Sequence, residues 1–162
     1  MCLIMCITPK PQTTYPKSVI NFVKDNPKAY NQKNLELLSE NIPVKQCDYL
    51  FNIYSNDSHI GFILCCLQVD DYYKSFYADK YKDYPIYEVE VGIFDEFQKA
   101  GFLSKFLNLI TSNNLLKSPC ILGIIVEQEN PLKRKIFNIL NSSKFECSYN
   151  DSDAPFEYYI VI

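Results

Sequence analysis

The chain has 162 residues, 48% of which are hydrophobic, and its formal net charge at pH 7 is −3. This length and apolar content suit one domain with a full core, so we expect a single domain over residues 1–162. The acidic balance argues against a nucleic-acid-binding protein, which usually carries a basic face. No apolar run approaches the roughly 18 residues that a membrane helix needs, so we expect no membrane partner.

The first part of the chain predicts a strand followed by two helices. The apolar run "CLIMCIT" precedes two prolines and has the length of a strand. Pro16 stands at a first helical position, and Val19, Phe22 and Val23 recur at the spacing of one helical face. Pro43 ends the second helix. The expected elements are a strand over 2–8 and helices over 16–26 and 31–41.

Two strand-like runs follow and predict a hairpin. The residues between them, Asn56, Asp57 and Ser58, are typical of a tight turn. His59 comes directly after this turn, and we expect it to be exposed and not catalytic. The two strands are expected over 47–55 and 59–69.

A polar, tyrosine-rich segment without clean periodicity comes next, over residues 70–85. At helical spacing such tyrosines usually pack against a core. Alternatively they form a wall for an acceptor or a protein partner, because tyrosine combines apolar area with a polar tip. The tyrosines concerned are Tyr72, Tyr73, Tyr77, Tyr81, Tyr84 and Tyr87, around Phe76.

Strands and helices alternate over the rest of the chain. Apolar residues alternate with Glu88, Glu90 and Gly92, which is the pattern of a strand. The continuous apolar run "CILGIIVE" indicates a strand buried on both faces. Asn130 is a helix cap, with Pro131 in the first turn. The expected elements are strands over 86–94, 120–127, 145–149 and 156–162, and helices over 99–116 and 130–143.

This order of elements predicts a mixed α/β fold. The strand–helix–strand unit over residues 86–126 should be a right-handed parallel crossover. In such sheets ligands bind at the carboxyl ends of strands, against the amino ends of helices.

The cysteines indicate an intracellular protein without a metal site. None of the seven cysteines has C-x-x-C spacing, and His59 is the single histidine, so we expect no zinc. Several cysteines lie in apolar runs, where a free cysteine behaves as a small buried hydrophobe. We therefore expect reduced cysteines and a cytoplasmic location.

Gly101 stands at the start of a predicted helix in a chain that has only four glycines. The first N–H groups of a helix lack partners within the helix and attract anions. A glycine there lets the backbone approach a ligand that a β-carbon would push away. Gly101 is therefore either an ordinary turn residue or part of a phosphate site.

At this point the sequence resembles the GNAT superfamily of acyl-CoA-dependent N-acyltransferases. The run "VGIFDEFQKAGFLSKFL" is similar to its motif A, a strand and loop followed by Q/R-x-x-G-x-G/A at the start of a helix. The run "IIVEQENPLKRKIF" is similar to its motif B, in which Asn130, Ile136 and Phe137 fall at matching positions. The order of elements also resembles that of the family from end to end.

The resemblance implies a single GNAT-like domain with a splayed central mixed sheet flanked by helices. It implies acetyl-CoA as co-substrate, held between the strands over 86–94 and 120–127. Backbone amides of residues 99–104 would hold the diphosphate, and residues 91–93 would pair with the pantetheine arm and stabilise the thioester oxygen. The implied binding residues are Val91, Gly92, Ile93, Gln98, Lys99, Ala100, Gly101, Phe102, Leu103, Ser104, Asn130 and Phe137.

Three positions depart from the family pattern. Leu103 replaces a Gly or Ala of motif A, and Lys144 replaces a glycine after motif B. Phe137 stands where many members have a Tyr that protonates the departing thiolate, and Phe has no proton to donate.

Three glutamates are candidates for the group that takes a proton from the amine. A primary amine is mostly protonated at neutral pH and must lose a proton before it attacks a thioester. Glu90 is the first choice, Glu127 the second and Glu88 the third, by their places on the two central strands. Alternatively, Glu88 and Glu90 form the solvent face of an alternating strand.

The leading hypothesis is an N-acetyltransferase that moves an acetyl group from acetyl-CoA to a primary amine by direct attack. The acceptor is a small molecule, a peptide or a protein, and the chain is a monomer or a homodimer. The alternative is a weak or inactive GNAT-like binding module whose tyrosine-rich segment, residues 70–87, binds a protein. A third reading, an acyltransferase toxin that acts on aminoacyl-tRNA, is disfavoured by the acidic net charge.

Overall fold

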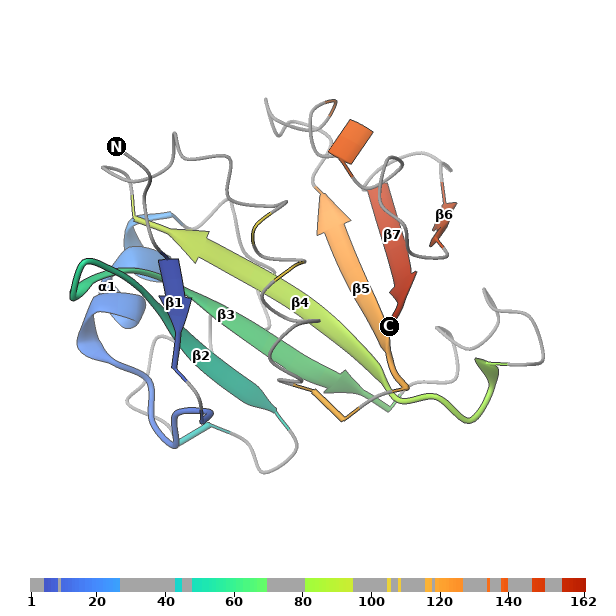
Figure 1. Cartoon of the computed structure of the whole chain (residues 1–162), viewed down its shortest axis with the longest axis horizontal. Helices are drawn as coiled ribbons and strands as arrows, with labels where there is room; N and C mark the ends of the chain where they lie inside the picture. Colours follow the sequence, from blue (N-terminus) through green and yellow to red (C-terminus); the bar gives the residue numbers. More distant parts are fainter. Residues whose placement is uncertain are drawn as a thin grey trace. The chain divides into compact units, whose positions relative to one another are not determined.

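A computed structural model gives the arrangement of the mixed α/β fold (Figure 1). It describes residues 5–8, 10–26, 43–44, 48–69, 81–94, 105, 108, 116–117, 119–126, 134, 138–139, 147–150 and 156–162. In chain order the elements are β1 (Met5–Ile7), α1 (Lys17–Asp25), β2 (Tyr49–Ser55), β3 (Ser58–Gln68), β4 (Ile86–Ile93), β5 (Ile121–Val126), β6 (Cys147–Asn150) and β7 (Phe156–Val161).

The predicted elements agree with these assignments where the two can be compared. Residues 105, 108, 134 and 138–139 are helical, inside the helices expected over 99–116 and 130–143. The helix expected over 31–41 lies outside the described residues. The chain divides into two compact units, which are described in turn: Met1–Cys65 with Glu90–Phe102, and Cys66–Val89 with Leu103–Ile162.

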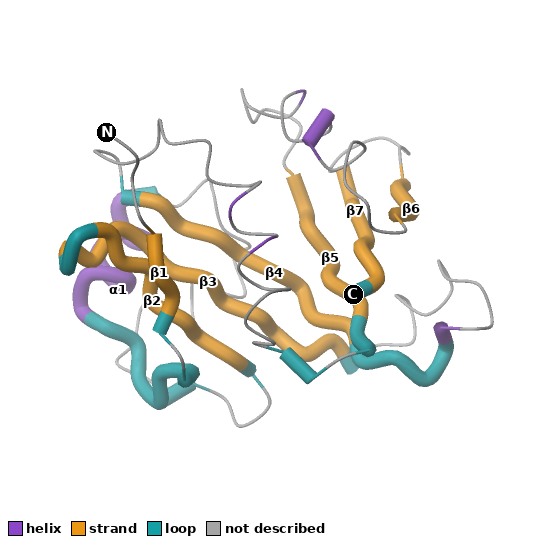
Figure 2. The backbone as a smooth tube through the Cα atoms, in the orientation of Figure 1, coloured by secondary structure: helices purple, strands orange, loops and turns teal. Residues whose placement is uncertain are grey.

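The first unit is built on the β2–β3 hairpin, as the sequence predicts. Asn56 and Asp57 form its two-residue turn with φ values of 48° and 66°. Two positive φ values match the twist of the flanking strands, and Asn and Asp tolerate them better than most residues. Figure 2 shows this turn in teal between the two strands. β1 pairs with the outer side of β2, also antiparallel.

Helix α1 packs through an apolar face. Val19, Ile20 and Val23 are buried, and the Phe22 ring lies 5.3 Å from that of Phe94 and 6.1 Å from that of Phe62. Pro16 lies one residue before the helix, at its N-cap, and not at the first helical position as predicted. Proline suits either place, because neither position needs a backbone N–H.

β3 and β4 approach each other closely at Gly61. A β-carbon on Gly61 would collide with the Gly92 carbonyl oxygen and lie 2.9 Å from Cδ1 of Ile93. One residue away, the Phe94 N–H donates to the Ile60 carbonyl oxygen at 3.0 Å. The missing side chain of Gly61 therefore determines how near the carboxyl end of β4 lies to β3.

His59 is half-buried in this unit, so the prediction that it is exposed is wrong. A register shift between Ile53 and Tyr54 places His59 opposite Tyr54, and the two rings stack with centroids 5.2 Å apart. The ring of Phe94 meets His59 edge-on at 5.1 Å. These aromatic neighbours, together with α1, cover the imidazole, which a pattern of turn residues does not reveal.

Both imidazole nitrogens of His59 are engaged. Nε2 lies 2.9 Å from the Gly61 carbonyl oxygen, which only accepts hydrogen bonds, so Nε2 carries the proton. Nδ1 lies 3.0 Å from Oγ of Ser18 on α1, whose hydroxyl donates to it in the neutral ring. Burial lowers the pKa of His59 from its ordinary 6.5, partly opposed by the bond to Gly61.

The second unit combines parallel and antiparallel pairs in the order β4-β5-β7-β6. β4 and β5 are parallel, as expected for a crossover, with Ile86, Tyr87 and Glu88 opposite Ile121, Leu122 and Gly123. β7 is antiparallel to both β5 and β6. Ile121 and Leu122 are fully buried, which confirms that β5 is covered on both faces.

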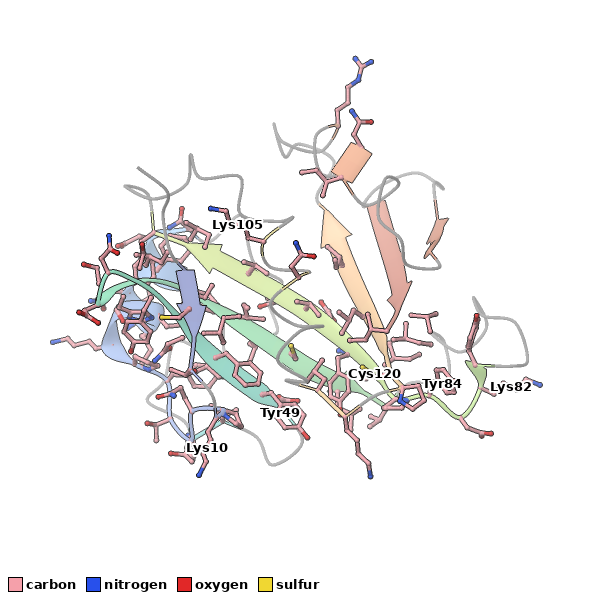
Figure 3. The ribbon with its side chains drawn as sticks, in the orientation of Figure 1. Lys10, Tyr49, Lys82, Tyr84, Lys105 and Cys120 are labelled. Atoms are coloured by element: carbon pink, nitrogen blue, oxygen red, sulfur yellow. The ribbon has the colours of Figure 1, made fainter. Side chains whose placement is uncertain are left out.

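Tyrosines complete the core of the second unit. Tyr81 and Tyr84 pack against the cluster of Ile86 and Ile121, and Tyr87 is buried. Figure 3 shows Tyr84 near Cys120 at the start of β5. Packing is therefore the role of these three tyrosines, while Tyr72, Tyr73 and Tyr77 lie outside the described residues. In the described part of the chain, no helix has the length and apolarity needed to span a membrane.

We predict that Gly61→Ala destabilises the protein by about 1–3 kcal/mol, because the new methyl group must displace the backbone of Gly92. Urea unfolding followed by circular dichroism measures this difference. The control is Ser58→Ala, at the exposed start of the same strand, which should stay within about 0.5 kcal/mol of wild type. Equal stability of the two variants would show that β4 does not lie this close to β3 at Gly61.

We also predict that the free energy of unfolding falls as the pH drops below 6.5. The unfolded His59 takes up a proton with a pKa near 6.5, whereas the folded side chain resists protonation to lower pH, so acid favours the unfolded state. Stability should be complete above this pH and should decline as the pH falls through the folded pKa. His59→Gln should flatten the decline in urea unfolding series; an identical pH dependence in the variant would contradict the assignment.

Candidate functional site

The predicted site residues that the structure describes all lie on β4. They are Glu88, Glu90, Val91, Gly92 and Ile93. The other predicted site residues lie outside the described residues: Gln98, Lys99, Ala100, Gly101, Phe102, Leu103, Ser104, Glu127, Asn130 and Phe137. β4 is therefore the element on which the candidate site can be built.

The backbone groups of β4 alternate between its two edges. The Pro85 carbonyl oxygen accepts from Ile121 N–H of β5 at 2.9 Å, while the Phe94 N–H donates to β3 at 3.0 Å. Because N–H and C=O groups switch edges at each residue of a strand, odd-numbered residues from 85 onward point to the edge away from β3. The N–H groups of Val91 and Ile93 therefore point to that edge, where they are suited to pair with an extended ligand.

Glu88 is buried, which rules out the solvent-face interpretation for this residue. The residue is 9% exposed, and its Oε2 accepts a hydrogen bond from Nε2 of Gln68 at 3.0 Å. The first four residues of β4 are buried in succession, and because successive side chains point to opposite faces, both faces of this part of the strand are covered. The alternating sequence of β4 therefore does not correspond to one buried and one solvent-exposed face.

Glu90 is less buried as a residue, but part of its carboxylate is shielded. The residue has intermediate exposure, and its Oε2 atom is removed from solvent. Glu88 and Glu90 are two residues apart on the strand, so their side chains leave the same face. Two of the three predicted carboxylates therefore lie on β4, and Glu127 lies outside the described residues.

Four of the seven cysteines have described side chains, and all four are reduced in this structure. Cys6, Cys65, Cys66 and Cys120 are all free, and the last three are buried. Burial raises the pKa of Cys120 to about 11, so its thiol stays protonated at neutral pH and is a poor nucleophile. Among the described residues, no three His, Cys, Asp or Glu side chains are grouped in a way that suits a metal ion.

Sequence reasoning missed Gln68. It ends β3, and its amide is the group that contacts Glu88. The only signal in the sequence is a polar residue at the end of an otherwise apolar strand, which is also what an ordinary strand end looks like.

Comparison with known proteins gives structural similarity without sequence similarity. No protein-family model and no curated protein sequence matches the chain. Among solved structures, Arabidopsis thaliana NAA60 with a bisubstrate analogue is 13% identical, with a TM-score of 0.58 and 98% of each chain covered. A chimera of Vibrio cholerae spermidine N-acetyltransferase SpeG and hSSAT is 16% identical, with a TM-score of 0.56 and 97% and 95% covered.

A third similar structure is the Campylobacter jejuni N-acetyltransferase PseH in complex with acetyl coenzyme A. It is 14% identical, with a TM-score of 0.53 and 98% of each chain covered. At such identities the similarity concerns the fold, and it extends over almost the whole of each chain. The chain therefore has the fold of the GNAT superfamily of acyl-CoA-dependent N-acyltransferases.

Proposed function

We propose that the protein is an N-acetyltransferase that moves an acetyl group from acetyl-CoA to a primary amine. The observation that carries the proposal is the full-length similarity to acetyltransferases, one of them solved with acetyl coenzyme A. The two carboxylates of β4, and the N–H groups of Val91 and Ile93 that point away from β3, agree with it.

The edge of β4 that points away from β3 fits the pantetheine arm of this co-substrate. Val91 and Ile93 would direct N–H groups toward the arm, and residues 99–104 would hold the diphosphate at the carboxyl end of the strand. The bound co-substrate supplies an activated acetyl group as a thioester. Since the diphosphate would lie beyond the end of β4, the arm would run back along the strand, toward the side chains of Glu90 and Glu88.

The protein's own task would be to orient the amine, remove its proton and exclude a competing nucleophile. A carboxylate of β4 would take the proton, directly or through a water molecule. The high pKa of Cys120 disfavours a cysteine-bound acyl intermediate at that residue and supports direct attack by the amine.

The acceptor that we propose is a primary amine on a small molecule, a peptide or a protein. The similar structures include an enzyme named for spermidine, which is a small polyamine. We further propose that the chain acts as one domain in the cytoplasm. The coverage of almost the full chain by single acetyltransferases and the free cysteines support this proposal.

We predict that the protein binds acetyl-CoA with a dissociation constant between about 1 μM and about 1 mM, the usual range for enzyme substrates. Isothermal titration calorimetry measures it, with S-acetylglutathione as a control thioester that lacks the nucleotide and diphosphate. Binding of acetyl-CoA alone is the expected result. Failure of acetyl-CoA to bind at millimolar concentration would rule the proposal out.

We also predict that replacing the accepting carboxylate by its amide lowers kcat by about 100-fold or more and flattens the rise of the rate with pH. Glu90→Gln and Glu88→Gln should be compared side by side in an assay of thiol release from acetyl-CoA over a panel of primary amines. An unchanged pH profile in both variants would move the role to another group. Acetyl-CoA binding without turnover by the wild-type chain would instead favour the binding module.

A further inference from the structure

Gln68, which is half-buried, and Glu88, which is buried, form a side-chain pair in the second unit. Glutamate is rarely buried unless its carboxylate is paired, and Glu88 is 9% exposed. One of its partners is a neutral amide, since Nε2 of Gln68 donates to Oε2 at 3.0 Å. A neutral donor orients the carboxylate but does not neutralise its negative charge.

The orientation of the Gln68 amide is determined by its two acceptors. Besides Glu88, Nε2 lies 3.3 Å from the carbonyl oxygen of Cys66, which only accepts hydrogen bonds. Both contacts require a nitrogen at this position, so the alternative orientation of the amide would lose both bonds. The side chain of Gln68 is thus held by its own strand while it holds Glu88.

The other neighbour of Glu88 in the sheet is a glycine. Gly123 of β5 is its partner in the parallel register, and this is the last pair in that register. Gly123 contributes no side chain beside the carboxylate, whereas Leu122 before it is fully buried.

We propose that Gln68 is a positioning residue that holds Glu88 as the proton acceptor of acetyl transfer. This inference rests on the proposed function. The ammonium form of the acceptor gives one proton to Glu88, and the neutral nitrogen forms a bond with the thioester carbon. The carbon–sulfur bond breaks, the nitrogen loses its second proton to the departing thiolate, and Glu88 returns its proton to water.

A neutral amide suits this role better than a cation does. A lysine or arginine at the same place would stabilise the charged carboxylate strongly and weaken it as a base. Gln68 keeps the carboxylate oriented at a smaller loss of basicity. Titratable groups on neighbouring positions of the sheet include Glu90, two residues along β4, and Cys66, two residues along β3. In the register of β2, Asp48 follows opposite Cys66, and β5 offers Gly123, which does not titrate.

The test compares two substitutions of opposite electrostatic effect in the full chain. Gln68→Met removes the hydrogen-bond donor at similar volume. We expect kcat/KM to fall about tenfold and the acidic limb of its pH profile to move to higher pH. Gln68→Lys places a cation beside Glu88, so the acidic limb should move to lower pH. Gln12→Met, a half-buried glutamine in the first unit, is the control and should leave the profile unchanged.

A second measurement does not depend on turnover. Carbon-13 NMR titration of the glutamate carboxyl carbons, assigned with Glu88→Gln, should give a higher midpoint for Glu88 in Gln68→Met than in wild type. Equal midpoints, or limbs that shift in the same direction in Gln68→Met and Gln68→Lys, would overturn the inference. Absence of wild-type turnover with every amine would overturn the proposed function, and with it this role of Glu88, even if the midpoints differ.

Discussion

The closeness of β3 and β4 depends on Gly61, which has no side chain to hold the strands apart. At this point the Gly92 carbonyl occupies the place that a β-carbon would need. The next residues continue the contact, since Phe94 bonds to Ile60 and its ring meets His59 and Phe22. The carboxyl end of β4 is thereby fixed within the first unit, and with it the directions of the Val91 and Ile93 amides.

Local chemistry allowed much of this fold to be predicted. The Asn56-Asp57 turn follows from the tolerance of these residues for positive φ, and the covered strand β5 follows from an uninterrupted apolar run. Both signals are contained within a few neighbouring residues. The resemblance to GNAT acyltransferases agrees with the structural comparisons, because it combined such local signals with the order of the elements.

The environment of single polar side chains was harder to predict. Alternation along β4 allowed a solvent-facing side at Glu88, but the first four residues of the strand are all buried, so both of its faces are covered there. His59 appeared to belong to a turn, while a one-residue register shift places it among aromatic rings. Such outcomes depend on which strands become neighbours, and a single sequence does not contain that information. The predicted diphosphate loop around Gly101 lies outside the described residues.

Among the described residues, β1, at the end of the strand order in the first unit, and β6, at the end in the second, form the shortest strands. β1 has three residues and β6 has four, whereas β3, inside the first unit, has 11. An exposed strand edge is a template for pairing with another chain, and a short edge offers few backbone groups for such pairing. The described strands therefore give little support for association through an extended intermolecular sheet.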